Sequence, residues 1–478
     1  MTTFIFHSSY KYPKHSTLLS TTKMRVITTL SSMIKPGGQT WSGRLALSEL
    51  DQTGMTTHVP TIYFYTKPSE NWHTVLQTLK ASLTTTLVHF YPLAGRLSSI
   101  ARGRLELNCN ANGVRFIEAY ADVKLVDLGD FFQYPFFDQL MPSVDYRNTP
   151  IEDTPLLLLQ VTRFLCGGWS LGFFISHVAV DGQSALHFLS EWARVCRGEP
   201  LGYPPYLDRK VLRAGYPPTV TFNGNIEQHA QCSPPPILIG QSSNENERRQ
   251  ETTVTMLKLT ETLVEKLLNK ANKNHKLESG RRFTRYEAVT AHAWRTACKI
   301  RNLEPDQKTS IGICIDVRRR MNPPLPEKYF GNAIVDLIAT GTSGELVSST
   351  LGFVSSKIRD TINKVDTDYV NSVIDFLKNQ EDLSKFQDHL QLSNNEKGPF
   401  YGNPNLGVIS WLTLPMYGID FGWGKELFTG PGTNDAEDGD FLILRGVEGV
   451  RSLIVAVCLQ VRHIEDFKRV FYQSIEED

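Results

Sequence analysis

The chain has 478 residues, which is enough for two domains of ordinary size and excludes a single small module. Hydrophobic residues make up 41% of it and charged residues 21%, and no apolar run approaches the roughly 18 residues of a transmembrane helix, so a membrane-inserted protein is not expected. The 50 basic residues are balanced by 50 acidic ones, which leaves no net field for nucleic acid or anionic lipid.

The seven cysteines are odd in number and scattered, and they show neither CxxC pairs nor the histidine spacing of a zinc site. We interpret them as reduced thiols, which fits a cytoplasmic protein because structural disulfides are uncommon in that compartment. No bound metal is predicted.

Residues 1–35 form an opening segment that is rich in Ser, Thr, Lys and His and contains no acidic residue. This composition resembles that of an organelle transit peptide. We favour the simpler interpretation, an extended and poorly ordered N-terminus in which Met24 is the natural start.

The next part of the chain, residues 36–201, is predicted to be an N-terminal domain. Residues 57–65 are rich in β-branched and aromatic residues, which predicts a strand. A helix follows, with apolar residues at a three-to-four spacing that ends near Tyr91, just before a proline. Residues 104–108 and 114–118 are separated by Asn and Gly, which predicts a hairpin.

Two longer apolar runs, residues 156–165 and 171–180, are joined by a short glycine-containing turn and are predicted to pair as antiparallel core strands. A helix over residues 182–197 follows. Residues 202–250 are rich in proline and glycine and lack periodicity, so we interpret them as a crossover loop between two domains.

Residues 251–478 are predicted to form a C-terminal domain of comparable size. It begins with a strand near Thr252, followed by helices over residues 260–274 and 284–298. Strand-like runs then alternate with helical ones, which indicates an α/β fold with mixed sheets. These runs are residues 311–316, 332–338, 406–414 and 453–461.

The motif that points to chemistry is His177-x-x-x-Asp181-Gly182, which places a histidine after a buried strand and a carboxylate four residues later. Taken alone the spacing is weak, because a chain with 12 histidines can produce it by accident. Without further context, a core histidine that binds a backbone group is the better explanation of His177.

Two further motifs occur in the expected order along the chain. Asp420-Phe421-Gly422-Trp423-Gly424 and Tyr329-Phe330-Gly331-Asn332 accompany the histidine motif, and together they resemble the BAHD acyltransferase family from about Gln39 to the C-terminus. Four more segments are similar to the spermidine hydroxycinnamoyl transferase branch of that family. They are residues 39–44, 90–96, 182–188 and 400–406.

The resemblance implies two chloramphenicol-acetyltransferase-like domains with mixed sheets and an interdomain channel. Acyl-CoA would enter one side as a co-substrate and the acceptor would enter the other, with no permanently bound cofactor and no partner chain, so a monomer is expected. His177 would lie midway as the general base, because an imidazole with a pKa near 6.5 is largely unprotonated at neutral pH. No acyl-enzyme is required, since the thioester is already activated.

The resemblance also assigns supporting roles. Asp181 would turn away from substrate and pair with Arg318, although a turn-stabilising aspartate would look the same. The indole of Trp411 would face the developing oxyanion, with a core tryptophan as the alternative. The loop containing Asp420, Gly422 and Gly424 would support the channel wall and would not act as an acid or base.

Arg281 and Arg282, with Arg285, are candidates for the coenzyme A phosphates, although a solvated basic run before a helix is the plainer explanation. On the acceptor side, relatives that esterify shikimate or quinate carry an arginine where this chain has Thr413. The loss of that bidentate clamp disfavours a carboxylate acceptor and favours a polyamine. Ile409 stands where such relatives often place a hydroxyl, so the oxyanion site would depend on Trp411.

Three alternatives remain open at this point. Gly168-x-Ser170-x-Gly172 matches the nucleophile elbow of a serine esterase, although a β-rich run follows it where a helix is needed. An inactive relative that serves as a binding module is the second. The third is a hydroxycinnamoyl-CoA acyltransferase with a different acceptor, such as an alcohol, shikimate, quinate, a monoamine or spermine.

Overall fold

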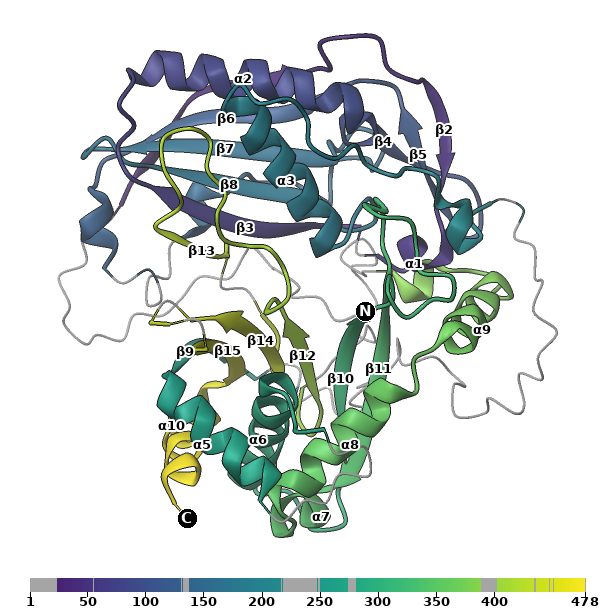
Figure 1. Cartoon of the computed structure of the whole chain (residues 1–478), viewed down its shortest axis with the longest axis vertical. Coiled ribbons are helices and arrows are strands. Elements are labelled where there is room, and N and C mark those ends of the chain that lie inside the picture. The colour runs from purple at the N-terminus through teal and green to yellow at the C-terminus, as the bar shows by residue number, and fades with distance from the viewer. Residues whose placement is uncertain are drawn as a thin grey trace.

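The computed structural model describes residues 24–477, apart from residues 55, 130, 132–136, 216, 218–246, 248–249, 274–280, 388–401, 434–435, 447 and 450. It consists of two halves, each built around a six-stranded mixed sheet (Figure 1). Most of the predicted crossover loop, residues 202–250, lies outside the described residues, as do residues 1–23 and the start of the segment 400–406.

The N-terminal sheet has the strand order β1-β6-β7-β8-β3-β13, in which only β6 and β7 run parallel. Helices α2 (Trp72–His89) and α3 (Gly182–Cys196) cover one face of it (Figure 1). Along β3, Tyr63 and Tyr65 pack under these helices, whereas Ile62 and Phe64 pack into a separate cluster on the other face. The strands are β1 (Val26–Ile34), β3 (His58–Tyr65), β6 (Val114–Ala121), β7 (Leu157–Phe164), β8 (Trp169–Ser176) and β13 (Phe428–Pro431).

Both edges of this sheet differ from the sequence-based prediction. Residues 26–34 form strand β1, which pairs with β6, so the expectation of a poorly ordered segment does not hold for them. They are an exposed, Ser- and Thr-rich edge strand, and for that reason their composition resembles that of a tail. At the other edge, β13 comes from the C-terminal half and pairs with β3.

The hairpin predicted over residues 104–108 and 114–118 is wrong. Both strands exist, but β5 (Leu105–Cys109) pairs with β2 (Gly43–Ala46) and β4 (Arg96–Ser99) in a separate three-stranded sheet, whereas β6 joins the large sheet. The turn residues between them change the direction of the chain without pairing its two arms.

The C-terminal sheet has the strand order β11-β10-β12-β14-β15-β9. Helices α5 (Glu261–Asn272), α6 (Arg285–Ile300), α8 (Leu351–Asn363) and α10 (Val461–Glu476) pack into the core on one of its faces, and α7 (Ser343–Ser348) and α9 (Thr367–Lys378) lie beside them (Figure 1). The strands are β9 (Thr252–Leu259), β10 (Lys308–Asp316), β11 (Ile334–Thr342), β12 (Leu406–Ser410), β14 (Asp440–Arg445) and β15 (Leu453–Gln460).

The two faces of the C-terminal sheet have different neighbours. Alternate residues such as Ile313 and Val408 face the helices. The opposite face, called here the second face, carries a smaller cluster, against which Ile409 and Trp411 pack. Trp411 also packs against the core of the N-terminal half, so the second face meets that half near this residue. The cluster consists of Leu442, Leu444, Ile454 and Ala456.

The two halves also meet through a short helix near the N-terminus, α1 (Glu49–Gln52), which contacts α9. Arg104 is buried there, with Nη1 donating to Glu49 at 2.9 Å and Nη2 to the carbonyls of Leu377 and Lys378. Within the described part of the chain, no helix is both long and apolar enough to cross a membrane.

Candidate active site

His177 lies in the turn between β8 and α3. The strand ends at Ser176, whose carbonyl accepts hydrogen bonds from Ala179 at 3.2 Å and Val180 at 3.3 Å, and this turn leads into α3. The His177 amide donates to the Thr57 carbonyl at 3.3 Å, which ties the turn to the start of β3. A half-buried imidazole is thereby held on a backbone that is fixed on both sides.

The His177 ring contacts the opposite half of the molecule through Asn332. Its Nδ1 lies 3.1 Å from Asn332 Oδ1, and Asn332 precedes β11 in the C-terminal half. Burial lowers the pKa of His177 below its ordinary value, although the charges of Asp181 and Asp336 and the Asn332 hydrogen bond oppose this shift. The imidazole is therefore neutral at pH 7 and able to accept a proton.

Asp181 and Arg318 are brought together as an ion pair between the halves. Arg318 Nη1 and Nη2 donate to the two carboxylate oxygens of Asp181 at 2.7 and 2.9 Å. The same carboxylate accepts from the amide of Ser184 at 3.0 Å, as the N-cap of α3, and from the amide of Ala333 at 3.0 Å. Burial raises the pKa of Asp181, but the Arg318 charge and these hydrogen bonds outweigh it and hold the pKa below its usual value.

Arg318 extends this connection to the loop that carries Asn332. Its guanidinium also donates to Asp316 Oδ2 at 2.8 Å, to Ser184 Oγ at 2.9 Å and to the carbonyl of Gly331 at 3.1 Å. One side chain therefore links the start of α3, the end of β10 and the residue before Asn332.

Trp411 and Thr413 follow the end of β12. The strand predicted over residues 406–414 ends at Ser410 in the structure, and a turn follows. The backbone amide of Trp411 donates to the Ile443 carbonyl at 2.9 Å. The half-buried Trp411 side chain packs against clusters from both halves, whereas Thr413 is exposed. Ile409 lies two residues earlier and packs against the second face.

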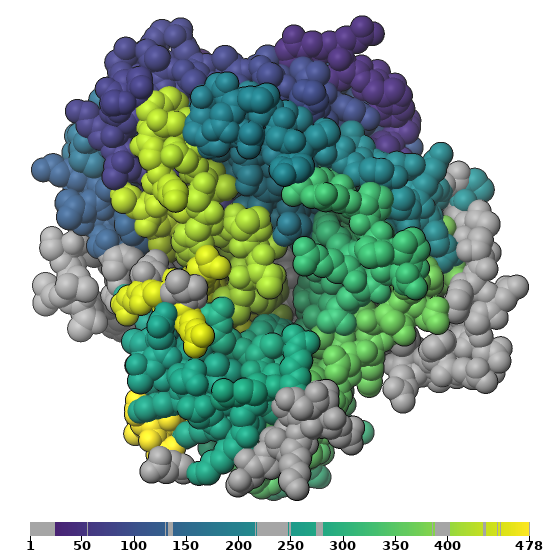
Figure 2. Space-filling view, in the orientation of Figure 1, coloured from purple at the N-terminus to yellow at the C-terminus, as the bar shows by residue number. Residues whose placement is uncertain are grey.

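The Asp420 loop is held by its own backbone. Asp420 Oδ1 accepts from the amides of Gly422 at 2.7 Å and Gly424 at 3.0 Å, and both glycines have φ above +100° (+109° and +103°). Phe421 is buried with its ring centroid 4.8 Å from that of Trp192 in α3. Figure 2 shows this yellow-green part of the C-terminal half against the N-terminal half.

Ser170 is not placed as an esterase nucleophile. It lies within strand β8, paired with Phe64 and Thr162 of the neighbouring strands, and its side chain is fully buried. A nucleophile elbow needs a sharp turn from strand to helix with an exposed hydroxyl, and neither is present at this residue.

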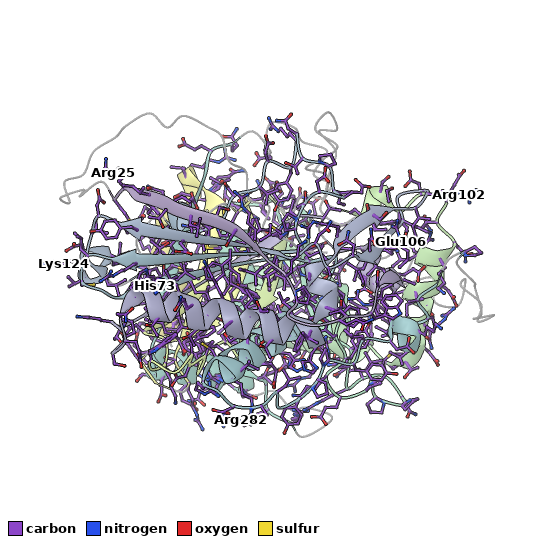
Figure 3. All side chains as sticks on the ribbon, turned by 90° about the horizontal axis from the view of Figure 1, so that it is seen from above. Arg25, His73, Arg102, Glu106, Lys124 and Arg282 are labelled. Atoms are coloured by element: carbon purple, nitrogen blue, oxygen red, sulfur yellow. The ribbon has the colours of Figure 1, made fainter. Side chains whose placement is uncertain are left out.

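Arg281 and Arg282 lie just before α6. Their backbone carbonyls accept from Arg359 at 2.7 and 2.8 Å, and the Arg282 side chain donates to Asn269 at 3.0 Å. Figure 3 shows Arg282 at the edge of the molecule. Arg285, in the first turn of α6, has a lowered pKa because of burial and the nearby positive charges of Arg445 and Arg451.

Sequence reasoning assigned no role to Asn332 or Asp51. Asn332 belongs to the Tyr-Phe-Gly-Asn motif, which was recognised as a pattern, but its hydrogen bond to His177 crosses 155 positions of the chain. Asp51 lies further still from Asn332 in sequence, at a separation of 281 residues. The Tyr-Phe-Gly-Asn motif was the one feature of the sequence that could have drawn attention to Asn332, and no motif marked Asp51.

Comparison with known proteins shows that this chain is similar to hydroxycinnamoyltransferases. The model of the family described as "Transferase family" matches residues 24–474. A hydroxycinnamoyl-CoA:piscidic acid hydroxycinnamoyltransferase of Actaea racemosa is 42% identical over 93% of this chain and 99% of its own length. A shikimate O-hydroxycinnamoyltransferase of Nicotiana tabacum is 36% identical over 94% and 100%, respectively. A hydroxycinnamoyl-CoA:5-hydroxyanthranilate N-hydroxycinnamoyltransferase of Avena sativa is 34% identical over the same shares, 94% and 100%.

Solved structures share the fold at low identity. Vinorine synthase superposes with a TM-score of 0.69 at 22% identity, over 92% of this chain and 96% of its own. TRI101 of F. sporotrichioides, complexed with coenzyme A and T-2, gives a TM-score of 0.70 at 17% identity, over 89% and 97%. The predicted α/β fold with two mixed-sheet domains is thereby confirmed.

Proposed function

Because the chain belongs to the Transferase family, the BAHD acyltransferases, we propose that it moves a hydroxycinnamoyl group from coenzyme A to a polyamine nitrogen, with His177 as general base. Acyl transfer from a coenzyme A thioester, without a permanently bound cofactor, is the activity that the family shares. The observation that carries the base assignment is the position of the His177 imidazole at the junction of the two halves, with Nδ1 3.1 Å from Asn332 Oδ1. Burial at this position lowers the pKa of His177, which favours its neutral form.

The proposed reaction is a direct transfer. The neutral acceptor nitrogen attacks the thioester carbonyl while His177 takes a proton from it. The tetrahedral intermediate then expels the thiolate of coenzyme A, which takes that proton back from His177 and leaves as the thiol. The indole N–H of Trp411 is proposed to donate to the developing oxyanion. Asp181 and Arg318 would hold the turn that carries His177 and would not touch substrate.

Replacement of His177 tests the base assignment. His177→Ala is expected to lower the transfer rate by about 10²- to 10⁴-fold while coenzyme A binding, measured by calorimetry, is retained. His73→Ala is the matched control, because His73 is exposed on α2 (Figure 3). Transfer by His177→Ala at the rate of the control would refute the assignment.

The acceptor is the finer part of the proposal. The three relatives described above are named for piscidic acid, shikimate and 5-hydroxyanthranilate, and so include both O- and N-acyl transfer. We propose spermidine because Thr413 offers no cation to an acceptor carboxylate.

Asp336 supports a cationic acceptor. It alternates along β11 with Val335 and Leu337, which face the helices, so its side chain lies on the second face of the sheet. Its charge is one of two carboxylate charges that oppose the lowering of the His177 pKa by burial. A carboxylate so near the base would attract an ammonium group and repel an acid acceptor.

An acceptor panel tests this part. Purified protein would be incubated with caffeoyl-, coumaroyl- or feruloyl-CoA and with spermidine, putrescine, spermine, shikimate or quinate, and products would be identified by mass spectrometry. Spermidine amides are expected, and Asp336→Asn should raise the KM for spermidine by about 10- to 100-fold. Ester products alone would refute the polyamine acceptor and support an O-acyltransferase.

Thr413→Arg provides the converse variant. It places at this position the arginine that the family resemblance gives to relatives that esterify shikimate, so it is expected to create or increase transfer to shikimate relative to spermidine. An unchanged acceptor ratio would show that Thr413 does not face the acceptor.

For the phosphates of coenzyme A, we propose Arg285 with Arg445 and Arg451 in addition to Arg281 and Arg282. The three arginines are close enough for the positive charges of Arg445 and Arg451 to lower the pKa of Arg285 further than burial alone. Such a concentration of positive charge attracts an anion. Arg445→Glu should raise the KM for the thioester without altering the KM for the acceptor.

We also propose that the enzyme is monomeric and cytoplasmic.

A further inference from the structure

The orientation of the Asn332 side-chain amide is fixed by its neighbours. Asn332 is fully buried, and its Nδ2 lies 2.7 Å from the carbonyl oxygen of His177, 3.3 Å from that of Val178 and 3.2 Å from Oδ1 of Asp51. Two of these three partners are backbone carbonyls, which can only accept, and the third is a carboxylate in an ion pair. An amide rotated by 180° would point its oxygen at three oxygens, so the NH₂ group must lie on this side.

This orientation determines which ring nitrogen of neutral His177 carries the proton. With the NH₂ group committed, Asn332 Oδ1 is the atom that faces His177 Nδ1 at 3.1 Å. An amide oxygen can only accept a hydrogen bond, so Nδ1 must donate. The lone pair of the imidazole is then on Nε2.

Asp51 and Arg209 hold Asn332 in this position. Asp51 Oδ1 accepts from the Asn332 backbone amide at 2.7 Å as well as from its side chain, and Asp51 Oδ2 lies 3.0 Å from Arg209 Nη1. Arg209 Nη2 donates at 2.7 Å to the carbonyl of Ala179, two residues beyond His177. Asp51 is fully buried and Arg209 is 1% exposed, so water does not compete for these bonds.

We propose that Asn332, held by Asp51 and Arg209, is the positioning residue that keeps the proton of His177 on Nδ1 and leaves Nε2 as the proton acceptor. The inference rests on the proposed role of His177 as general base. It goes beyond that role because it assigns Asn332, Asp51 and Arg209 as the residues that select the tautomer.

The choice of an amide has a chemical consequence. A carboxylate at this position would stabilise the imidazolium and raise the pKa of His177 by about 1 to 3, which would protonate more of the base at neutral pH. A neutral amide fixes the same tautomer without adding a charge. The histidine can thus remain unprotonated below neutrality and still present one defined nitrogen.

The direct test is the tautomer itself. Protein labelled with ¹⁵N-histidine would be studied by NMR at pH 7, with the His177 signals assigned from their loss in His177→Gln. We expect a protonated Nδ1 and an unprotonated Nε2 for His177. A proton on Nε2 would overturn the inference, and this measurement requires no variant at Asn332 and no turnover.

Variants test the residues that select the tautomer. Asn332→Ala should lower kcat by about 10- to 100-fold, leave the KM for the thioester unchanged and give His177 signals that report a mixture of tautomers. Asn332→Asp should move the acidic limb of the kcat/KM profile to higher pH. Asp51→Asn should weaken the tautomer preference through loss of the Arg209 ion pair.

Asn405→Asp is the matched control for the same chemical change. Asn405 is partly buried in the C-terminal half, where its side chain accepts from the Ser310 amide at 3.0 Å, so this variant should leave the tautomer and the pH profile unaltered. Thermal unfolding of each variant identifies those that do not fold. An Asn332→Ala protein that folds and keeps the wild-type tautomer and kcat would overturn the proposal.

The outcomes for the two proposals are separable. A chain that transfers no acyl group but shows the Nδ1–H tautomer would contradict the proposed function and leave the assignment of Asn332 intact. A chain that depends on His177 but carries its proton on Nε2 would do the opposite.

Discussion

The protonation state of His177 depends on the burial of its ring and on a few neighbouring side chains. Burial lowers the pKa of its imidazole, and the carboxylates of Asp181 and Asp336 offset only part of this shift. The neutral form of this imidazole therefore persists to a pH below the ordinary histidine pKa of about 6.5. The charge state that the proposed proton abstraction requires is present before any substrate binds.

A pH profile of transfer should separate the base from the acceptor. A depressed pKa means that His177 is protonated only as the pH falls below about 6.5, so transfer to a hydroxyl acceptor should be constant from pH 7 upward. An amine with a pKa near 10.4 must lose a proton first, so transfer to spermidine should rise above neutrality. Release of the coenzyme A thiol between pH 5 and 9 measures both. An acidic limb above pH 7 with a hydroxyl acceptor would contradict a depressed His177 pKa.

At the scale of elements, the start of α3 is a junction between the halves. Asp181 caps the helix and at the same time binds Arg318 of the opposite half. The turn that carries His177 lies directly before this cap, so its conformation depends on an interaction that crosses the domain boundary.

Asp181→Asn should destabilise the protein at neutral pH by about 3 to 5 kcal/mol, because it removes the buried carboxylate that binds both Nη atoms of Arg318 and leaves the more exposed Asp316 as the remaining carboxylate partner. The pKa of Asp181 is lowered in the folded protein, so its contribution is complete above the unfolded value of about 3.9 and is lost as the pH falls below it. Urea unfolding at several pH values should show the difference from wild type shrinking below pH 4. A difference independent of pH would contradict the ion pair as its cause.

The Asp420 loop depends on glycine. Gly422→Ala would force a side chain onto a backbone with φ of +109°, which should cost about 1 to 2 kcal/mol in urea unfolding. Gly215→Ala is the control, because that glycine has an ordinary φ and open space around it. Equal stabilities for the two variants would show that the loop relaxes. The proposed supporting role also predicts that folded Gly422→Ala protein retains its KM values.

Long elements were predictable from the sequence, because β7, β8, α3, α5 and α6 carry uninterrupted apolar patterns. Strands β1 and β13 could not be predicted from the sequence. β1 is largely exposed and β13 has four residues, so neither produces a periodic hydrophobic pattern. A candidate site could be predicted where a residue type suggests its chemistry, as for His177. The proposed role of Asn332 could not be predicted, because it depends on neighbours supplied by distant segments.

On the scale of the whole molecule, the two halves share a sheet. β13 leaves the C-terminal half to pair with β3 of the N-terminal half, and Phe428 packs beside Phe64 and Phe131, with ring centroids 6.3 and 5.4 Å away. The N-terminal core therefore includes side chains from both halves. A loss of packing at β13 should therefore destabilise both halves of the molecule.

Phe428→Ala tests this coupling. Removal of a buried aromatic ring should cost about 3 to 5 kcal/mol and shift a single cooperative unfolding transition to lower denaturant, as followed by tryptophan fluorescence and circular dichroism. The exposed Phe353→Ala is the control. Two separated transitions in the wild-type protein would show that the halves unfold independently.

The position of β13 in the sequence also determines when the N-terminal sheet can be completed during translation. The edge of β3 that receives it belongs to residues 58–65, but its partner is residues 428–431, which are synthesised 363 residues after Tyr65 (428 − 65). During translation the edge of β3 stays without this partner until residue 431 has been added, and unpaired edges of this kind invite aggregation. Nascent chains stalled before residue 428 should therefore be clients of chaperones that bind exposed strands.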